Sequence, residues 1–289
     1  MITVQNATPA MFEDVHALLR RFHNHAMSKE DWRRMLFQYP WPAEDDNRGH
    51  VLLDGARVVG FLGALLSTRE IDGRKERFCN LSSWIVLEAY RARSLSLLAP
   101  ILRLEDHTIV CSTPSPTAHR LFVRTGHKTL EDRVLLLPPL ATWPELHSLR
   151  RATMTTDESE VRAALTGEAR RCFDDHRGSL GASLLLQRDG QTCWAKATLK
   201  RRSGFRFAAI QHLSNPKLFW ECLPLAKIGF LKALHAPTLA VDARFARGHH
   251  VPCSLSWRLT TPRLYRPARE DIRPEHVDGL YSELMGLRT

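Results

Sequence analysis

Two arginines and two serines stand at the end of an apolar stretch, in the segment WIVLEAYRARSLSLLAPIL of residues 84–102. Guanidinium groups make charge-assisted hydrogen bonds to phosphate oxygens, and the unpaired backbone N–H groups at a helix start favour the same anions. Arg91 and Arg93 come directly before a helix expected over residues 94–104. The segment is therefore a candidate phosphate site. The alternative is that Ser94 only caps the helix while both arginines are solvated.

The elements around this segment follow the order of an α/β domain. Apolar residues at helical spacing predict two helices before residue 40, and Ser28, three residues before Asp31, predicts the start of the second. Asp54-Gly55 and Asp72-Gly73 predict hairpin turns between three strand-like runs. The order ends with a strand at residues 107–113, a helix at 117–125 and a strand at 133–140.

The second half of the chain repeats this order after a polar, proline-containing stretch. Helices come first, then a hairpin around Asp189-Gly190, a third strand, a helix with Pro224 near its middle, and a last strand. The sequence therefore predicts an α/β (α+β) protein of two related domains, each a mixed, mostly antiparallel sheet flanked by helices. The expected parts are a domain at 1–140, a linker at 141–155, a second domain at 156–289, and a short amphipathic helix within 273–287.

The bulk composition limits the classes of function. Hydrophobic residues make up 44% and charged residues 25%, which is typical of a globular protein, and no run approaches the ~18 apolar residues of a membrane span. The N-terminus lacks the order of a signal peptide, so a cytoplasmic protein is expected. The six cysteines form no CxxC pair and the 14 histidines no clear ligand set, so the sequence predicts no metal site. The net charge of +10 favours an anionic partner.

Two segments resemble the signatures of GNAT-type acyl-CoA N-acyltransferases. The first signature, V-x-P-x-[YF]-[RQ]-x-x-G-x-G/A, is matched at Val86, Tyr90 and Arg91, while Ser94 and Ser96 stand where glycines are expected. The second, N-x-x-A-x-x-[LF]-Y-x-x-x-G-F, is similar to SPTAHRLFVRTGH. There Ala118, Leu121 and Gly126 match, whereas Ser115, Phe122 and His127 replace the asparagine, the tyrosine and the phenylalanine. The resemblance covers about residues 2–140 and implies a GNAT-like fold for that part.

The resemblance also implies where an acyl-CoA cosubstrate, acetyl-CoA or another, would bind. Its pyrophosphate would lie against the backbone of residues 92–97, and its pantetheine arm between the central strands. The residues implied in cofactor binding are Val86, Arg91, Ala92, Arg93, Ser94, Leu95, Ser96 and Leu97. The second half has no arginine followed by small residues at the corresponding place, and Pro216 removes a donor there, so it is expected to bind no CoA.

Acyl transfer to an amine needs a base for the amine proton and often an acid for the leaving thiolate. The family's tyrosine, the implied acid, is Phe122 here, so other groups must be considered. The candidates for catalysis are Ser82, Cys111, Ser112 and His119, with Cys79, Asn80, Ser83, Thr113 and His107 as further neighbours. Each has a structural alternative: the serines as sheet hydroxyls, the cysteine as a small buried residue and the histidine as a surface residue.

The function implied is an acyl-CoA-dependent acyltransferase, in the first place an N-acetyltransferase. Its acceptor would be an amine, or with less support a hydroxyl, of a small molecule or sugar precursor. A narrower resemblance links NLSSW, TPSP, PRLYR and LYSEL to GNAT-like proteins of bacterial polysaccharide or cell-envelope biosynthesis. The alternative is a non-catalytic acyl-CoA sensor on the same scaffold, which Phe122 favours. Nucleic-acid binding has only the charge in its support, and the sequence leaves a homodimer open.

Overall fold

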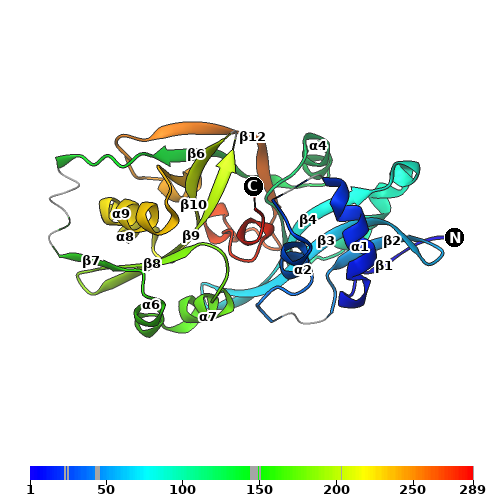
Figure 1. The fold of residues 1–289 in the computed structure, drawn as a ribbon, viewed down its shortest axis with the longest axis horizontal. Helices are drawn as coiled ribbons and strands as arrows, with labels where there is room; N and C mark the ends of the chain where they lie inside the picture. Colours follow the sequence, from blue (N-terminus) through cyan, green and yellow to red (C-terminus); the bar gives the residue numbers. More distant parts are fainter. Residues whose placement is uncertain are drawn as a thin grey trace. The chain divides into compact units, whose positions relative to one another are not determined.

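The chain divides into two compact units. The computed structural model describes residues 1–22, 24, 26–42, 46–143, 149, 151–202 and 204–288. Unit 1 comprises Met1–Thr129, Arg263–His276 and Tyr281–Arg288, and unit 2 comprises Leu130–Pro262 and Val277–Leu280. Figure 1 labels the helices and strands and colours the chain from blue at the N-terminus to red at the C-terminus. No helix in the described part of the chain is long and apolar enough to cross a membrane.

Unit 1 contains a mixed sheet whose first four strands form an antiparallel meander. The meander is β1 (Ile2–Asn6), β2 (Gly49–Asp54), β3 (Arg57–Ile71) and β4 (Arg74–Val86). The predicted Asp54-Gly55 and Asp72-Gly73 turns join these strands. Strand β5 (His107–Cys111) is parallel to β4, and the last residues of β12 (Leu255–Arg266) lie antiparallel on its other side.

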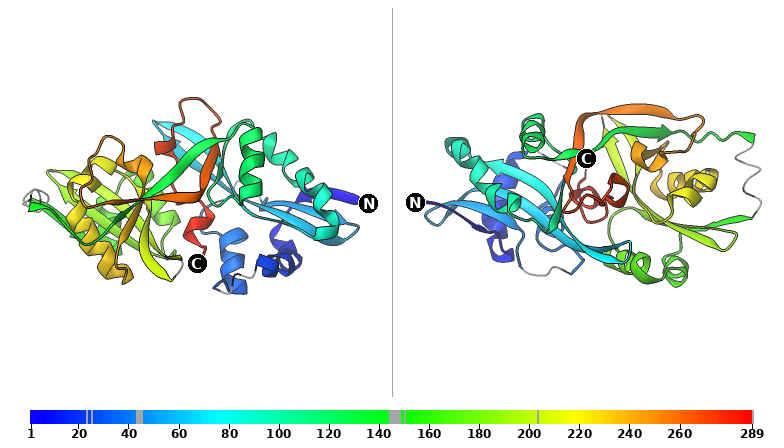
Figure 2. Two further views of the ribbon diagram at one scale, coloured as in Figure 1. Left: turned by 90° about the horizontal axis from the view of Figure 1, so that it is seen from above. Right: turned by 180° about the vertical axis from the view of Figure 1, so that it is seen from behind.

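Helices cover both faces of this sheet. Successive residues of a strand point to opposite faces, so Phe61 packs with one helical layer and Leu62 with the other. The first layer holds α1 (Phe12–Leu19) and α2 (Lys29–Leu36), and the second holds η3 (Glu88–Leu97), α3 (Ala99–Leu102) and α4 (Pro116–Arg124). In Figure 2 the blue α1 and α2 lie on one side of the sheet and the green helices on the other.

The helix predicted over residues 94–104 is wrong in type and in bounds. A 3₁₀ helix, η3, begins earlier at Glu88, and the α-helix α3 is only four residues long. Pro100 explains the difference, because a proline inside an α-helix removes an N–H donor and clashes with the preceding turn. The proline is tolerated at the start of α3. The anion-binding argument therefore rests on the basic 3₁₀ segment and not on a helix starting at Ser94.

Unit 2 has the same order of strand pairings as unit 1. Strands β7 (Ala152–Thr155), β8 (Ala182–Arg188), β9 (Gln191–Arg202) and β10 (Phe205–Leu213) pair antiparallel in sequence. Strand β11 (Leu239–Asp242) is parallel to β10, and β6 (Lys128–Leu137) lies antiparallel on its other side. The first part of β12 follows β6 in the strand order. The repeated pairing supports the related topology that the sequence predicts.

The helices of unit 2 occupy the same places between the strands. Helices α6 (Glu158–Ala164) and α7 (Gly167–Asp175) connect β7 to β8, and α8 (Pro216–Glu221) and α9 (Leu223–Leu234) connect β10 to β11. The helix predicted around Pro224 is in fact two helices. The proline lies in the first turn of α9, where its missing N–H needs no partner.

The units divide the chain differently from the predicted ranges 1–140 and 156–289. Strand β6 falls mostly in unit 2 because it pairs with β11, and the predicted linker at 141–155 lies partly outside the described residues. The C-terminal segment returns to unit 1 through residues 263–276 and 281–288. The amphipathic helix predicted at 273–287 is wrong: the segment contains only two 3₁₀ turns, η5 (Pro274–His276) and η6 (Glu283–Met285).

Candidate active site

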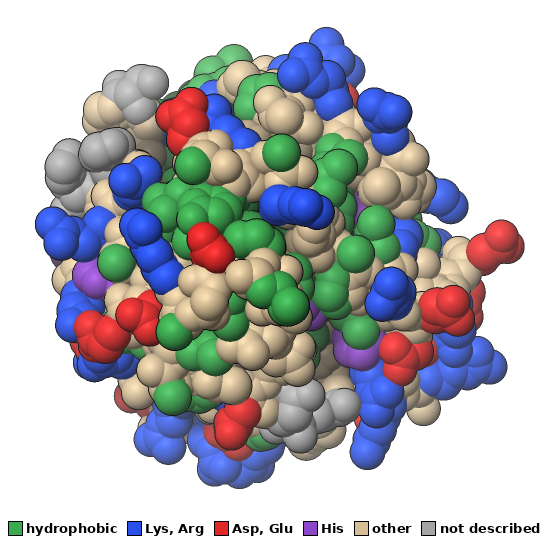
Figure 3. Space-filling model, turned by 90° about the vertical axis from the view of Figure 1, so that its right-hand side faces the viewer, with side chains coloured by type: hydrophobic (Ala, Val, Ile, Leu, Met, Phe, Trp, Pro, Cys, Tyr) green, Lys and Arg blue, Asp and Glu red, His purple; other side chains and the backbone are tan. Residues whose placement is uncertain are grey.

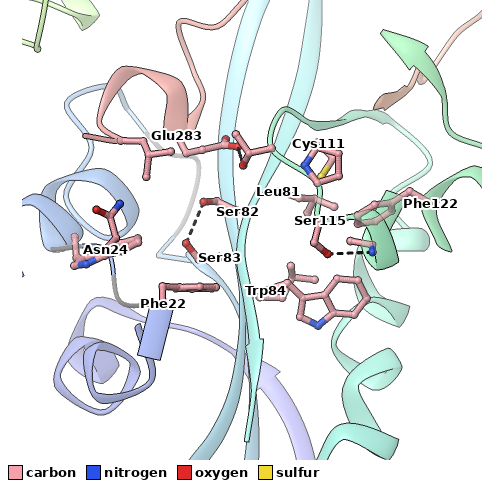
Figure 4. A pocket seen from close by; sticks show the side chains of 16 residues that line it. Phe22, Asn24, Leu81, Ser82, Ser83, Trp84, Cys111, Ser115, Phe122 and Glu283 are labelled. Carbon is pink, nitrogen blue, oxygen red and sulfur yellow. Dashed lines mark hydrogen bonds between the residues drawn. The ribbon is translucent and has the colours of Figure 1, made fainter. Parts of the chain in front are cut away.

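Unit 1 contains a cavity of about 310 Å³ where β4 and β5 separate. The parallel pairing of the two strands ends at Asn80 and Val110, although β4 continues to Val86. Leu81, Ser82, Ser83 and Trp84 of β4 line one side of the cavity, and the segment after β5 together with Phe122 of α4 lines another. In Figure 4 Ser82 and Ser83 lie on one side of the β4 ribbon, and Leu81, Trp84 and Phe122 lie on the other. The cavity is therefore a product of the strand separation.

A β-bulge in β4 forms part of the cavity wall. Phe61 and Gly63 of β3 pair with Ile85 and Ser82, so two residues of β4 oppose the single residue Leu62. The bulged residue Ser83 has a φ of 56°, which is uncommon for any residue except glycine. A bulge leaves its extra residue outside the ladder, and backbone strain of this kind gathers at functional sites. Backbone polar groups of β4 are thereby available at the cavity.

The predicted CoA-binding residues form one continuous stretch after the bulge. Val86 ends β4, and the other seven residues belong to η3. Arg91 and Arg93 are exposed, and Arg91 makes only a long 3.7 Å ion pair with Glu88. The serines are half-buried, Ala92 and Leu95 are exposed, and Leu97 is buried in the core. None of these residues lines the cavity, so they could hold the phosphate end but not the reacting end of a long cosubstrate.

The tyrosine of the first signature has a structural contact. Tyr90 Oη donates a hydrogen bond of 2.8 Å to Asp54 Oδ2 at the end of β2. This bond raises the pKa of the Tyr90 phenol, because the phenol is held as a donor beside a carboxylate. The contact fixes η3 against the end of β2, and Arg91 directly follows this anchored tyrosine.

The structure brings two of the four predicted catalytic residues to the cavity. Ser82 lines it with its Oγ 3.1 Å from the Ser83 Oγ, and Cys111 lines it from the end of β5. Burial, and secondarily the charge of Glu283, raise the pKa of the Cys111 thiol, so it remains protonated near neutral pH. Ser112 and His119 are outside the lining. Ser112 directly follows β5 and His119 lies on α4, so each is the chain neighbour of a lining residue without lining the cavity itself.

Phe122, which stands at the position of the implied acid, is a core residue that also borders the cavity. Its ring is 1% exposed and lies 5.9 Å from the Trp84 ring and 4.9 Å from the His127 ring. A phenyl ring donates no proton, and the neighbouring Cys111 thiol holds its proton tightly. The lining thus offers hydroxyl groups and backbone groups, but no phenol, to a leaving thiolate.

Sequence reasoning missed the carboxylate of Glu283. This residue lies in η6 and lines the cavity, and its Oε1 accepts a hydrogen bond of 2.7 Å from Thr113 Oγ1. Asn24 and Trp32 of the α1–α2 region were also missed. No local pattern signals a role for Glu283, because about 170 residues separate it from its partner along the chain. Only the return of the C-terminal segment to unit 1 places it here.

The histidine beside Phe122 gives unit 1 a predicted dependence of stability on pH. Burial lowers the pKa of His127 from 6.5 to about 4, so below pH 6.5 the unfolded chain binds a proton that the folded chain does not. Stability should therefore fall as the pH falls, by about 2 kcal/mol from pH 7.5 to pH 5 at 1.36 kcal/mol per pKa unit. His127→Phe should remove this part of the slope in urea unfolding at the two pH values. An unchanged slope would contradict the assignment to His127.

The arrangement of unit 1 defines a class of fold. Solved structures of GCN5-related N-acetyltransferases share the fold of this chain, a mixed sheet flanked by helices. No protein-family model matches the chain, and no curated protein matches its sequence. The resemblance that the two sequence signatures suggested is thus confirmed at the level of fold.

Three solved structures illustrate the likeness. A GCN5-related N-acetyltransferase from Anabaena variabilis is 11% identical with a TM-score of 0.59, over 93% of this chain and 73% of its own. A putative acetyltransferase from Pyrococcus horikoshii is 12% identical with a TM-score of 0.52, over 95% and 92%. The Saccharomyces cerevisiae N-myristoyltransferase with bound myristoyl-CoA is 11% identical with a TM-score of 0.50, over 97% and 83%. At such low sequence identities the structural likeness shows the fold alone. The reaction has to be argued from the residues of the site.

Proposed function

We propose that this protein transfers an acyl group from acyl-CoA, in the first place acetyl-CoA, to an amine. The acceptor is a small molecule or sugar precursor, and a hydroxyl acceptor has less support. The observation that carries the proposal is the cavity between β4 and β5, with the bulge at Ser83 in its wall and the basic segment η3 directly after it. Acyl-CoA is a long molecule with phosphates at one end and the thioester at the other. The exposed segment η3 would hold the phosphates, and the cavity between the strands would hold the thioester.

The reaction is a direct transfer without a covalent enzyme intermediate. The lone pair of the amine attacks the thioester carbonyl carbon, a C–N bond forms, and the C–S bond breaks with its electron pair remaining on the CoA sulfur. Backbone N–H groups at the bulge are proposed to stabilise the carbonyl oxygen as it becomes negative. Positioning of the two reactants in the cavity supplies much of the rate. The nitrogen loses one proton to water as the amide forms, and the departing thiolate takes its proton from water, because Phe122 has none to give.

The cosubstrate's phosphates are proposed to bind at η3. Arg91 and Arg93 are both exposed, and no carboxylate among the described residues pairs with Arg93. No side chain caps the first turn of η3; Tyr90 N donates to the Leu87 carbonyl at 2.9 Å, so the N–H groups proposed to meet an anion are those before Tyr90. In unit 2 the corresponding place differs, because Asn215 Oδ1 accepts a hydrogen bond of 3.1 Å from Leu218 N and so caps α8. We therefore assign acyl-CoA binding to unit 1 alone.

Phe122 favours a second candidate function, a non-catalytic acyl-CoA sensor. A sensor could use the same fold and the same basic segment to bind acyl-CoA. At the position of the implied proton donor it would need no acid, and the residue there is the buried Phe122. Nucleic-acid binding has less support. In Figure 3 basic side chains lie around the edge of the displayed face and are mixed with acidic ones, while hydrophobic side chains occupy much of its centre. A nucleic-acid interface would instead present a continuous basic stripe.

Acetyl-CoA is expected to raise the melting temperature of the wild-type protein, and Arg91→Glu should weaken the effect. Replacing a cation by an anion beside a phosphate should raise the apparent Kd about tenfold or more at low salt, since each charge-assisted bond contributes about 1.5–3 kcal/mol. Thermal-shift titrations at several ionic strengths measure this. Arg103→Glu, with the same charge change on an exposed residue just after α3, is the matched control and should bind normally. Equal effects of both substitutions would reject η3 as the site.

Release of free CoA thiol separates the enzyme from the sensor. Wild-type protein mixed with acetyl-CoA should release thiol only when a suitable amine is added, and the acylated amine should appear in equal amount by mass spectrometry. Stabilisation by acetyl-CoA without thiol release across a panel of amines and amino sugars would favour the sensor.

A further inference from the structure

The C-terminal segment of unit 1, residues 281–288, is held at both of its ends, at one by β4 and at the other by α2 and the residues before it. Asn80 Nδ2 in β4 donates a hydrogen bond of 2.9 Å to the Tyr281 carbonyl, and the Asn80 side chain is buried. At the other end, Arg288 pairs with Asp31 at 3.1 Å, and Asn24 Nδ2 donates to the Arg288 carbonyl at 3.1 Å. The segment is therefore a fixed part of the cavity wall.

Between these two anchors, η6 presents Glu283 to the cavity. The residue is 1% exposed, and Ser282 caps the turn by accepting a hydrogen bond of 3.2 Å from Leu284 N. Thr113 Oγ1 donates to Glu283 Oε1 at 2.7 Å, and both residues line the cavity. Figure 4 shows Glu283 reaching from the C-terminal segment toward Cys111. Its position is thus set by backbone anchors and by a directed hydrogen bond.

Glu283 is the single charged residue among the described residues that line this cavity. The other polar residues of the lining are serines, Thr113, Asn24, Cys111 and tryptophans, none of which accepts a proton readily at neutral pH. Cys111 is excluded as a base because burial and the Glu283 charge keep its thiol protonated. An amine entering this cavity as an ammonium ion therefore meets one carboxylate and no competing acceptor.

We propose that Glu283 is the general base of the acyl transfer, and this inference rests on the proposed function. The carboxylate attracts the ammonium form of the acceptor and accepts one of its N–H protons, which frees the nitrogen lone pair. The lone pair then forms the C–N bond to the acyl carbon as the C–S electron pair leaves with the CoA sulfur, and the nitrogen, now positively charged, loses its second proton to water. Thr113 is a positioning residue that directs one carboxylate oxygen. The site accordingly selects acceptors that carry an ammonium group.

Glu283→Gln tests the role, because the amide keeps the shape and an acceptor for Thr113 but removes the base. Transfer to an alkyl amine at pH 7 should fall about a hundredfold, as is common when a general base is lost. The rate of the variant should rise with pH toward the wild-type rate as the amine loses its own proton. Transfer to hydroxylamine, which is unprotonated at pH 7 and needs no base, should change less than about fivefold. The apparent Kd for acetyl-CoA, from thermal-shift titration, should stay within twofold of the wild-type value.

The matched control is Glu270→Gln, which removes an exposed carboxylate of the same C-terminal region outside the cavity and should leave both reactions unchanged. Glu283→Asp keeps a carboxylate, so its rate of transfer to the alkyl amine should be at least tenfold higher than that of Glu283→Gln. This second variant tests the role even if Glu283→Gln folds poorly. Equal losses for the alkyl amine and hydroxylamine, or a wild-type rate in Glu283→Gln, would overturn the assignment. Absence of thiol release from the wild-type protein with every amine would instead overturn the proposed function, and the base with it.

Discussion

Ala118→Trp is expected to lower acyl transfer more than about a thousandfold, because the indole would fill the space in which we propose that the two reactants meet. Ala118 lies on α4 and its small side chain lines the cavity between β4 and β5. Its backbone N–H donates to Ser115 Oγ at 3.2 Å, and this N-cap bond survives the substitution. The helix should therefore form normally while the cavity is lost.

The matched control is Thr117→Trp, one residue away on the exposed side of the same helix. It adds the same ring to solvent and should keep activity and melting temperature near wild type. Rates come from thiol release with a panel of amines, and folding is followed by circular dichroism. An active Ala118→Trp protein with wild-type kinetics would place the reaction outside this cavity and would reject the site.

Gly49→Ala is expected to destabilise unit 1 by more than about 4 kcal/mol, among the largest effects of single substitutions. Gly49 begins β2 with a φ of 115°, a conformation that side chains rarely adopt. An added Cβ would overlap the Leu62 carbonyl oxygen and would lie 2.8 Å from Ala64 N. Both contacts are backbone atoms of β3 and cannot move without breaking the ladder that holds Leu62 at the cavity.

Gly55→Ala is the control for this substitution, because Gly55 also has a positive φ of 60° but has no atom within 4 Å of the added Cβ. It should cost only about 1–2 kcal/mol, the strain of the left-handed conformation alone. Urea unfolding with a fluorescence probe measures both variants. Gly181 in unit 2 has the same kind of contact, with the Ala197 carbonyl, so Gly181→Ala should be as damaging as Gly49→Ala. Similar small losses in all three variants would show that β2 and β8 can shift to admit a Cβ.

The paired glycines also bear on the repeat that the sequence suggested. Gly49 begins β2 and Gly181 directly precedes β8, and both strands are the second of their meander. In each unit the fourth strand pairs parallel with the fifth, as β4 with β5 and β10 with β11. Both units thus share their strand order and a close approach of backbone atoms at one glycine.

Local chemistry in the sequence predicted most of the elements of unit 1. Ser28 and Asp31 form the expected capping box, the two Asp-Gly turns join the strands as predicted, and Gly126 ends α4 with a φ of 86°. These signals are reliable because each depends on residues within a few positions of one another. The helix predicted at 94–104 is wrong for a local reason as well, because Pro100 can stand in the first turn of an α-helix but not in its interior.

The sequence alone predicted the class of fold, which the solved structures confirm, and the segment that we propose to hold a phosphate, since turns, caps, strand periodicity and charge are properties of neighbouring residues. The construction of the cavity, by contrast, became visible only in the tertiary structure. The separation of β4 from β5, the bulge at Ser83 and the placement of Glu283 against Thr113 depend on pairings between distant parts of the chain. No periodicity encodes such contacts, because their energy exists only once the C-terminal segment has packed against unit 1.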